Sequence, residues 1–243
     1  MKTILILGAS SDIANAAAVR FAGENYSVIL AGRNIKQLQI HARDISIRYS
    51  VTAYASEFDV LKYKSHKSFY SSLKPSPDVV LCAIGMLGNQ ETSEINFDHA
   101  KLIMDTNYTG CVSILNEAAA DFQNKKSGCI IGISSVAGDR GRKSNYTYGS
   151  AKSAFSEYLS GMRNRLSSHG VHVLTVKPGF VKTKMTENMN LPGILTASPE
   201  AVADDIYKAC MKRKSILYTK WFWKYIMLII KIIPEFMFKK MSL

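Results

Sequence analysis

Short runs of apolar residues alternate along the chain with longer segments in which apolar and polar positions recur at helical spacing. The runs are rich in Val, Ile and Leu, as is typical of strands covered on both faces of a parallel sheet. This alternation predicts an α/β fold, a doubly wound parallel sheet of about seven strands. The predicted strands lie at 3–7, 27–31, 51–55, 78–83, 129–133, 171–176 and 216–218, and the predicted helices at about 12–24, 35–49, 60–73, 97–124, 146–168 and 199–211.

The length of 243 residues fits one domain with a substantial core. Composition changes only near residue 215, so we assign residues 1–215 to the main domain. Residues 216–243 then hold a last short strand and an amphipathic helical tail. The four cysteines have no paired spacing, which indicates free thiols and no metal site. The first apolar run is too short for a signal-peptide core and is interpreted as a strand.

The C-terminal tail carries much of the positive charge. Residues 211–243 contain eight basic residues and one acid, a net +7 within the total of +12. Lys220, Lys224, Lys231 and Glu235 would fall within about 60° of one another on a continuous helix. Aromatic and aliphatic residues fill the other positions, and Pro234 is expected to end this helix and begin a second, short one.

A narrow basic stripe among apolar side chains is typical of a helix that lies in a membrane interface. We therefore expect residues 220–243 to contact a membrane surface; an oligomer interface or a lid over a substrate cleft is the alternative. The longest charge-free apolar stretch in the tail is too short to span a bilayer. The tail is also too apolar, and too poor in side chains that read bases, for nucleic-acid binding to be expected.

A candidate phosphate-binding turn follows the first predicted strand. Gly8 permits a tight turn, Ser10 and Ser11 offer hydroxyls, and a helix N-terminus follows, as in a dinucleotide-binding (Rossmann) fold. Asp12 is unfavourable beside a pyrophosphate unless its carboxylate turns away to cap helix amides. Arg33 ends the second strand, where an acid usually marks NAD; an arginine suits a 2′-phosphate and favours NADP(H) over NAD(H), unless it is merely a solvated loop residue.

Tyr148 and Lys152 have the spacing Y-x-x-x-K, and Ser135 stands thirteen residues before Tyr148. Residues four apart share one helix face, so the lysine ammonium can lie near the phenol and favour its phenolate. A nearby serine hydroxyl can orient a carbonyl or an alcohol. The three groups suit proton transfer in a carbonyl–carbinol interconversion. By itself the spacing also occurs by chance on solvated helices.

Together with further motifs in the same order, these residues resemble the short-chain dehydrogenase/reductase family over roughly residues 1–210. Asp59 ends the third strand, Cys82-Ala83-Ile84-Gly85 follows the fourth, Asn107 lies in a helix, and Pro178-Gly179-Phe180-Val181-Lys182-Thr183 follows a later strand. Two departures stand out. Asp12 and Ala14 replace the usual glycines, and Cys82-Ala83 replaces Asn-Asn.

The resemblance implies a role for each matching residue. Tyr148 would give a proton to the carbonyl oxygen, Ser135, rather than its neighbour Ser134, would bind that oxygen, and Lys152 would support the phenolate and contact the nicotinamide ribose. Asn107 would seat a relay water. The implied cofactor contacts are Gly8, Ser10, Ser11, Ile13, Arg33, Asp59, Ala83, Gly85, Tyr148, Lys152, Pro178, Val181 and Thr183.

Residues 85–90, 139–145 and 148–152 look like the family branch that contains decaprenylphosphoryl-2-ketoribose reductase. This likeness implies the keto group of a polyprenyl-phosphate-linked sugar as substrate, in cell-envelope polysaccharide synthesis. Arg140 and Arg142 would receive a phosphate of such a substrate, or form a solvated basic loop. A reductase of a lipid ketone, or a non-catalytic cofactor-sensing protein on the same fold, is the alternative.

The resemblance also suggests a homodimer or homotetramer, packed through the helices that bear Asn107 and Tyr148. With the basic tail, it leads us to expect a cytoplasmic protein associated peripherally with the inner face of a membrane.

Overall fold

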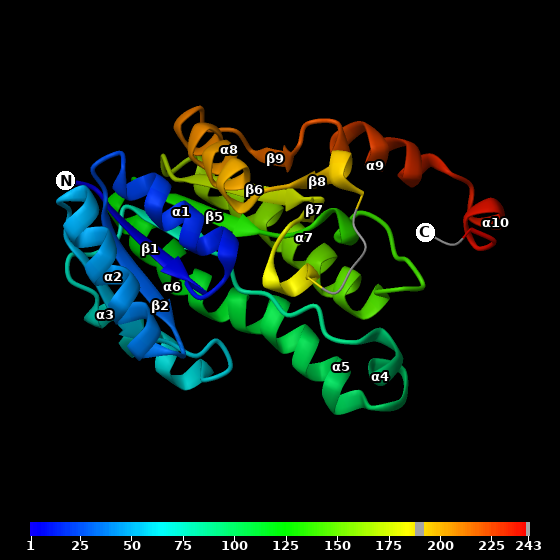
Figure 1. Ribbon diagram of the computed structural model, residues 1–243, viewed down its shortest axis with the longest axis horizontal. Helices are drawn as coiled ribbons and strands as arrows, with labels where there is room; N and C mark the ends of the chain where they lie inside the picture. The colour runs from blue at the N-terminus through cyan, green and yellow to red at the C-terminus, as the bar shows by residue number, and fades with distance from the viewer. Residues whose placement is uncertain (188–191, 242–243) are drawn as a thin grey trace.

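The computed structural model describes residues 1–187 and 192–241 of the chain. Its centre is a seven-stranded, all-parallel sheet in the order β3-β2-β1-β4-β5-β6-β9 (Figure 1). This is the predicted doubly wound fold. The strands are β1 (Thr3–Leu7), β2 (Ser27–Gly32), β3 (Ala53–Glu57), β4 (Val79–Cys82), β5 (Cys129–Ile133), β6 (His172–Pro178) and β9 (Ile216–Thr219).

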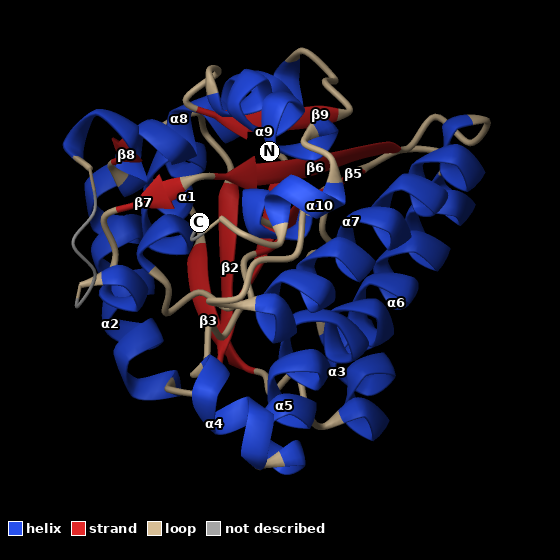
Figure 2. Cartoon of the chain, turned by 90° about the vertical axis from the view of Figure 1, so that its right-hand side faces the viewer, coloured by secondary structure: helices blue, strands red, loops and turns tan. Residues whose placement is uncertain are grey.

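Helices cover both faces of the sheet, as buried parallel strands require (Figure 2). On one face lie α1 (Asp12–Ala22), α2 (Ile35–Tyr49) and α8 (Pro199–Met211). On the other lie α3 (His66–Ser72), α6 (Gly110–Lys125) and α7 (Tyr146–Ser167). The carboxyl ends of the strands form one edge of the sheet, which is where doubly wound proteins bind their ligands.

Several element boundaries differ from the prediction. The third strand is β3 at Ala53–Glu57, two residues later than expected, because the apolar Val51 packs in the core before pairing begins. The predicted helix 60–73 begins with the short turn η1 (Tyr63–Ser65) before α3. The predicted helix 97–124 is three pieces, α5 (Phe97–Met104), the π-helical turn η2 (Asp105–Thr109) and α6.

Some short elements were not predicted at all. The helix α4 (Gln90–Ile95) buries no residue, so no apolar period marks it in the sequence. The two-residue strands β7 (Phe180–Val181) and β8 (Thr196–Ala197) pair beside the sheet, near the 3₁₀ turns η4 (Lys184–Thr186) and η5 (Gly193–Leu195). A third such turn, η3 (Val136–Gly138), follows β5.

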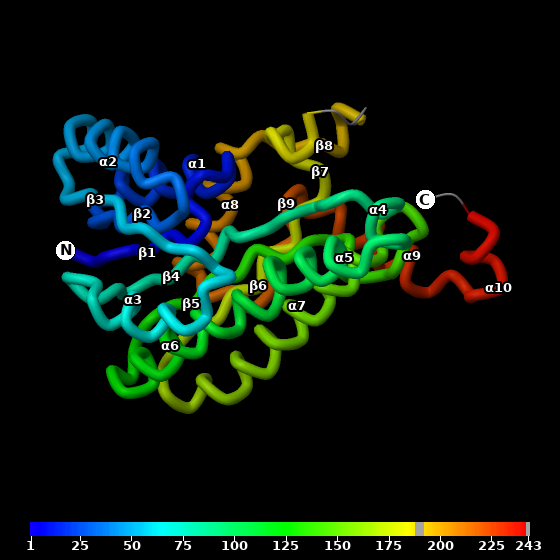
Figure 3. The backbone as a smooth tube through the Cα atoms, turned by 90° about the horizontal axis from the view of Figure 1, so that it is seen from below, coloured from blue at the N-terminus to red at the C-terminus, as the bar shows by residue number. Residues whose placement is uncertain are grey.

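The tail forms α9 (Trp223–Ile232) and α10 (Glu235–Phe238), at the end of the molecule remote from the N-terminus (Figures 1 and 3). As predicted, Pro234 ends the first tail helix and a second, short one follows, but the four charged residues do not share one helix. Lys220 has a left-handed backbone (φ 54°) before α9 begins, and Pro234 separates Glu235 from it. Of the four, only Lys224 and Lys231 belong to α9. Residues 242–243 of the predicted tail lie outside the described residues.

One side of α9 packs on the domain, and the other faces outward. Trp223 and Met227 are buried against Val136 and Phe180, while Leu228, Ile229 and Ile232 are each more than half exposed. No helix in the two described ranges is long and apolar enough to cross a bilayer.

Candidate active site

The turn after β1 has the geometry expected of a phosphate-binding turn. Gly8 has a φ of +79°, and a side chain there would collide with Ile84. The Ser11 hydroxyl caps α1 by accepting from the Ala14 amide at 3.3 Å. Ser10 lines the pocket beside this turn, and its hydroxyl has no hydrogen-bond partner among the described residues. The Asp12 carboxylate does turn away, as a bound phosphate would require, but it accepts from the Lys184 amide at 2.8 Å rather than capping α1.

Two adjoining cavities lie along the carboxyl ends of the strands and meet at Ser10, Ala83, Ile84 and Gly85. One, of about 510 Å³, is lined by Gly8, Arg33 and Asp59. The other, of about 340 Å³, is lined by the remaining predicted cofactor residues, Ser11, Ile13, Tyr148, Lys152, Pro178, Val181 and Thr183. Two cavities joined beside a helix N-terminus fit an extended dinucleotide.

Arg33 is exposed at the rim of the larger cavity. Its guanidinium makes no hydrogen bond or ion pair with the described part of the chain. Asp59, nearby, uses a carboxylate oxygen to accept from the Leu61 amide at 3.0 Å, which fixes the loop that follows β3. Arg33 is therefore available to a charged group in this cavity.

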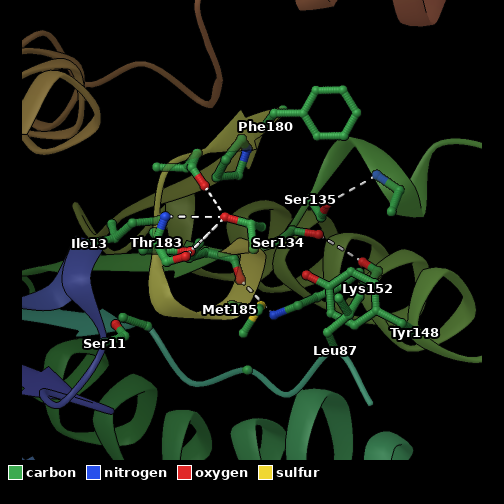
Figure 4. Close-up of a pocket in the computed structure, with 18 of the residues that line it drawn as sticks. Ser11, Ile13, Leu87, Ser134, Ser135, Tyr148, Lys152, Phe180, Thr183 and Met185 are labelled. Carbon is green, nitrogen blue, oxygen red and sulfur yellow. Dashed lines mark hydrogen bonds between the residues drawn. The ribbon is translucent and has the colours of Figure 1, made fainter. Parts of the chain in front are cut away.

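Ser135, Tyr148 and Lys152 face one another across the smaller cavity (Figure 4). Lys152 is 2% exposed, and its ammonium donates to the carbonyl oxygens of Ile84 at 3.2 Å and Ile133 at 3.0 Å. It lies 5.8 Å from the centre of the Tyr148 ring. Two carbonyl dipoles thus fix a positive charge beside the phenol without neutralising it with a carboxylate. Such a charge stabilises negative charge on the tyrosine.

The two neighbouring serines differ in what they contact. Ser134 is 3% exposed. Its hydroxyl donates to the Lys152 carbonyl at 2.9 Å and is hydrogen-bonded to the Ser156 hydroxyl at 2.7 Å. Ser135 Oγ accepts from the Ala137 amide at 3.1 Å, so its own proton remains available. The geometry therefore favours Ser135 as the serine that binds a substrate oxygen.

Asn107 lies fully buried in the π-helical turn η2, a feature that is frequent at functional sites. Its amide nitrogen donates to the carbonyls of Met86 at 2.7 Å and Ile103 at 2.8 Å, and its oxygen accepts from the Met86 amide at 3.2 Å. Asn107 lines neither cavity, but it fixes the segment next to Gly85. Its part in a proton relay remains a prediction.

Apolar residues that sequence reasoning missed form much of the pocket wall. Leu87, Val136, Phe180 and Met185 all line the smaller cavity, and Figure 4 labels Leu87, Phe180 and Met185 around the same pocket as Tyr148 and Lys152. They lie in loops or very short elements, where no periodicity distinguishes a pocket residue from a core residue. Asn145 also lines this cavity and was missed.

The two arginines predicted to bind substrate phosphate lie in different places. Arg140 turns to the tail, where it donates to the carbonyls of Ile230 and Ile233, pairs with Glu235 and stacks on Phe238. Arg140 does not line the catalytic cavity. Its contacts are with the tail and not with the predicted phosphate site. With the Lys231 carbonyl, at 3.1 Å, five groups of the tail thus contact its guanidinium.

Arg142 does line the catalytic cavity. Its Nε is buried without a hydrogen-bond partner among the described residues, and its Nη2 contacts only the weak acceptor Met227 Sδ, at 3.3 Å. The nearby Asp139 is already paired with Lys177 at 2.5 Å and Tyr218 at 2.8 Å. Burial lowers the pKa of Arg142, and the Asp139 charge only partly opposes this.

No cluster of His, Cys, Asp or Glu within residues 1–187 and 192–241 has the arrangement of a metal site. The four cysteines are buried free thiols, of which Cys129 and Cys210 lie with their sulfurs 3.3 Å apart.

Three comparisons place this geometry among known proteins. The sequence profile described as short chain dehydrogenase matches residues 2–192. An uncharacterized oxidoreductase of Mycobacterium tuberculosis is 33% identical over 98% of this chain and 96% of its own length. An NADP-dependent 3-hydroxy acid dehydrogenase of Schizosaccharomyces pombe is 27% identical over 89% of each chain. A short-chain dehydrogenase of Sphingobium yanoikuyae, solved with NADPH, superimposes with a TM-score of 0.83 over 97% of each chain at 19% identity.

Proposed function

Because the chain belongs to the short-chain dehydrogenase family and is an oxidoreductase of the NAD(P)-dependent kind, we propose a specific reaction for it. It reduces a ketone to an alcohol with NADPH, and the ketone is the keto group of a sugar linked to polyprenyl phosphate. The reaction belongs to cell-envelope polysaccharide synthesis. The observation that carries the choice of substrate is Arg142, an incompletely paired guanidinium in the wall of the catalytic cavity.

The chain's own residues account for the proton in this reaction. A bound nicotinamide supplies the hydride to the carbonyl carbon. Tyr148 donates its phenolic proton to the carbonyl oxygen, and Ser135 donates a hydrogen bond that orients that oxygen. Lys152, held by two carbonyls, stabilises the phenolate that remains. The products are the alcohol and the oxidised cofactor, and solvent returns the proton to Tyr148.

NADPH is preferred over NADH because Arg33 stands free at the rim of the larger cavity. A guanidinium binds a 2′-phosphate with paired hydrogen bonds, whereas the 2′-hydroxyl of NAD favours an acid at this position. The names of two similar proteins, one NADP-dependent and one solved with NADPH, point the same way.

The phosphate preference follows from the electrostatics of the pocket. A guanidinium that is partly buried, with no carboxylate of its own, is stabilised when an anion enters. The carboxylate of Asp139 is satisfied by Lys177 and Tyr218, so it leaves the positive charge of Arg142 largely uncompensated. A phosphate on the substrate supplies the missing partner. The apolar wall formed by Leu87, Val136 and Phe180 supports the second candidate, a reductase of a lipid ketone.

The tail supports a membrane setting for either substrate. Tyr225, Leu228, Ile229 and Ile232 on α9 are each more than half exposed, with Lys224 and Lys231 on the same helix. An apolar face flanked by lysines binds lipid through its apolar area and anionic headgroups through its charge. We propose that this face rests on an anionic membrane surface, where a polyprenyl-linked substrate resides.

Steady-state kinetics with two substrates test the proposal. NADPH oxidation is measured with an oxidised polyprenyl-phosphoryl pentose and with a long-chain ketone that lacks phosphate. Arg142→Met should raise the KM of the phosphate substrate about tenfold or more and leave that of the plain ketone nearly unchanged. Arg48→Met is the control, since Arg48 is exposed on α2 and lines neither cavity. Efficient turnover of only the plain ketone would favour the second candidate, and no reduction of either ketone would contradict the reductase itself.

A further inference from the structure

Asn145 immediately precedes α7, three residues before Tyr148, yet its side chain does not cap the helix. Asparagine is favoured at this position because its oxygen accepts from an amide of the first turn. Here the Thr147 amide donates instead to Gln90 Oε1, at 3.0 Å, from the helix α4. The side-chain oxygen of Asn145 therefore does not cap the helix, as an N-cap asparagine usually does.

The free oxygen belongs to a residue of the catalytic cavity. Asn145 lines the same pocket as Ser135 and Tyr148, and its Oδ1 is buried with no hydrogen-bond partner in the described part of the chain. Buried acceptors are nearly always paired, with protein, water or ligand. Arg142 Nε, a donor on the same wall, is unpaired as well. A substrate with hydroxyl groups can satisfy both, because a hydroxyl donates and accepts.

The position of Asn145 determines which part of a substrate it reaches. Asn145 and Tyr148 line the same cavity, so both can contact the same bound molecule. A carbonyl oxygen held by Tyr148 and Ser135 would place the groups beside the ketone in the cavity that Asn145 also lines. We propose that Asn145 binds a hydroxyl on the carbon next to the ketone, with Oδ1 accepting a hydrogen bond from that hydroxyl.

This inference rests on the proposed reductase and narrows its substrate to α-hydroxy ketones, the chemical class of keto sugars. A plain lipid ketone would leave the Asn145 oxygen buried and unpaired. Sites built to hydrogen-bond a substrate hydroxyl discriminate strongly against analogues that lack it. Asn145 is therefore a specificity residue for the group beside the ketone, and Tyr148 and Ser135 act on the ketone itself.

A matched pair of ketones tests the inference. Phenacyl alcohol carries a hydroxyl next to its ketone, and propiophenone has a methyl group in the same place. The kcat/KM ratio of the two, with NADPH, is measured for the wild type and for Asn145→Leu. The ratio should fall about 10- to 100-fold in the variant. The intrinsic reactivity of each ketone is the same in both enzymes, so the change in ratio reports the subsite alone.

Ser144→Ala is the control, since Ser144 is exposed and lies outside the catalytic cavity, and its ratio should equal that of the wild type. Asn145→Ala is the second variant, because it removes the acceptor without adding bulk, and it should show the same fall. If the kcat/KM ratio is unchanged in both Asn145 variants, the proposal is overturned. This holds even if kcat/KM falls for both ketones, because a displaced Tyr148 would lower both values alike. Reduction of neither ketone by the wild type contradicts the reductase instead.

Discussion

The indole ring of Trp223 occupies the space that a side chain on Gly179 would need. A Cβ at position 179 would lie 2.0 Å from Trp223 Nε1, and that nitrogen donates to the Leu195 carbonyl at 3.2 Å. Trp223 also meets the Phe180 ring edge-to-face at 5.3 Å. The first turn of α9 is thus packed directly on the segment that forms one wall of the catalytic cavity.

Gly179→Ala should therefore displace both α9 and this wall. The added methyl group cannot be accommodated unless the indole moves, because the indole is held on its other sides by Phe180 and Leu195. We expect a loss of about 2 kcal/mol in the free energy of unfolding and a decrease in kcat/KM. Thermal unfolding measures the first effect, and steady-state rates of NADPH oxidation measure the second.

The control for this variant is Gly161→Ala. Gly161 lies in α7, and a Cβ there meets nothing within 4 Å. It should keep or slightly raise stability, by up to about 1 kcal/mol, since alanine favours helix over glycine. If Gly179→Ala is as stable and active as wild type, the close packing of Trp223 on the pocket wall is wrong.

Arg140 holds the other end of α9. Its guanidinium donates to the carbonyls of Ile230, at 2.9 Å, and Ile233, at 2.7 Å, which lack helical partners at a helix C-terminus. Arg140→Met should loosen α9 and α10 by about 2 kcal/mol and speed amide exchange in residues 223–238 more than tenfold. Hydrogen exchange read by mass spectrometry measures this, with Arg48→Met on the distant α2 as the control. Equal exchange in both variants would contradict the anchoring role.

The sequence was informative where a pattern is long or a motif has fixed spacing. The strands from Thr3 to Leu7 and from Cys129 to Ile133 were predicted to the residue, since a fully buried strand is apolar throughout. The cofactor candidates were found because chemistry fixes both their type and their order along the chain, and all of them line one of the two cavities.

The sequence was uninformative where three-dimensional contacts decide. Arg140 and Arg142 are two residues apart in one basic loop, yet one binds the tail and the other faces the pocket. Nothing local distinguishes them, because the partners of Arg140 lie about ninety residues away. Asn145 was missed for a similar reason. Only the contact from Gln90 to the Thr147 amide shows that Asn145 is not an ordinary helix cap.

The choice of cofactor depends on Arg33. Arg33→Asp replaces a group that attracts a 2′-phosphate with one that repels it and can bind a 2′-hydroxyl. The KM for NADPH should rise about 10- to 100-fold, and the KM for NADH should fall. Initial rates with each cofactor measure this. Lys36→Ala, an exposed cation outside the cavity, should change neither value. An unaltered NADPH preference in Arg33→Asp would contradict the assignment.

Membrane binding by the exposed face of α9 can be tested without removing the helix. Deletion of the tail would also remove Trp223 and Met227 from their core contacts, so point variants are better. Leu228→Asp with Ile229→Asp should abolish flotation with vesicles that contain phosphatidylglycerol, since both side chains are more than half exposed. Ile47→Asp is the control, because Ile47 is 76% exposed on α2. Flotation that persists in the α9 variant would contradict the proposed surface.

The central claim is that Tyr148 gives the proton that accompanies hydride transfer to a ketone. The most direct measurement uses NADPH with deuterium at the transferable position and follows both the rate and the label in the alcohol. Wild type should place deuterium on the carbinol carbon, and Tyr148→Phe should lower kcat by about 10²- to 10⁴-fold. Tyr146→Phe, which removes an exposed hydroxyl bonded to Glu94, should stay near the wild-type rate. Full activity in Tyr148→Phe, or an alcohol without deuterium, would contradict the account.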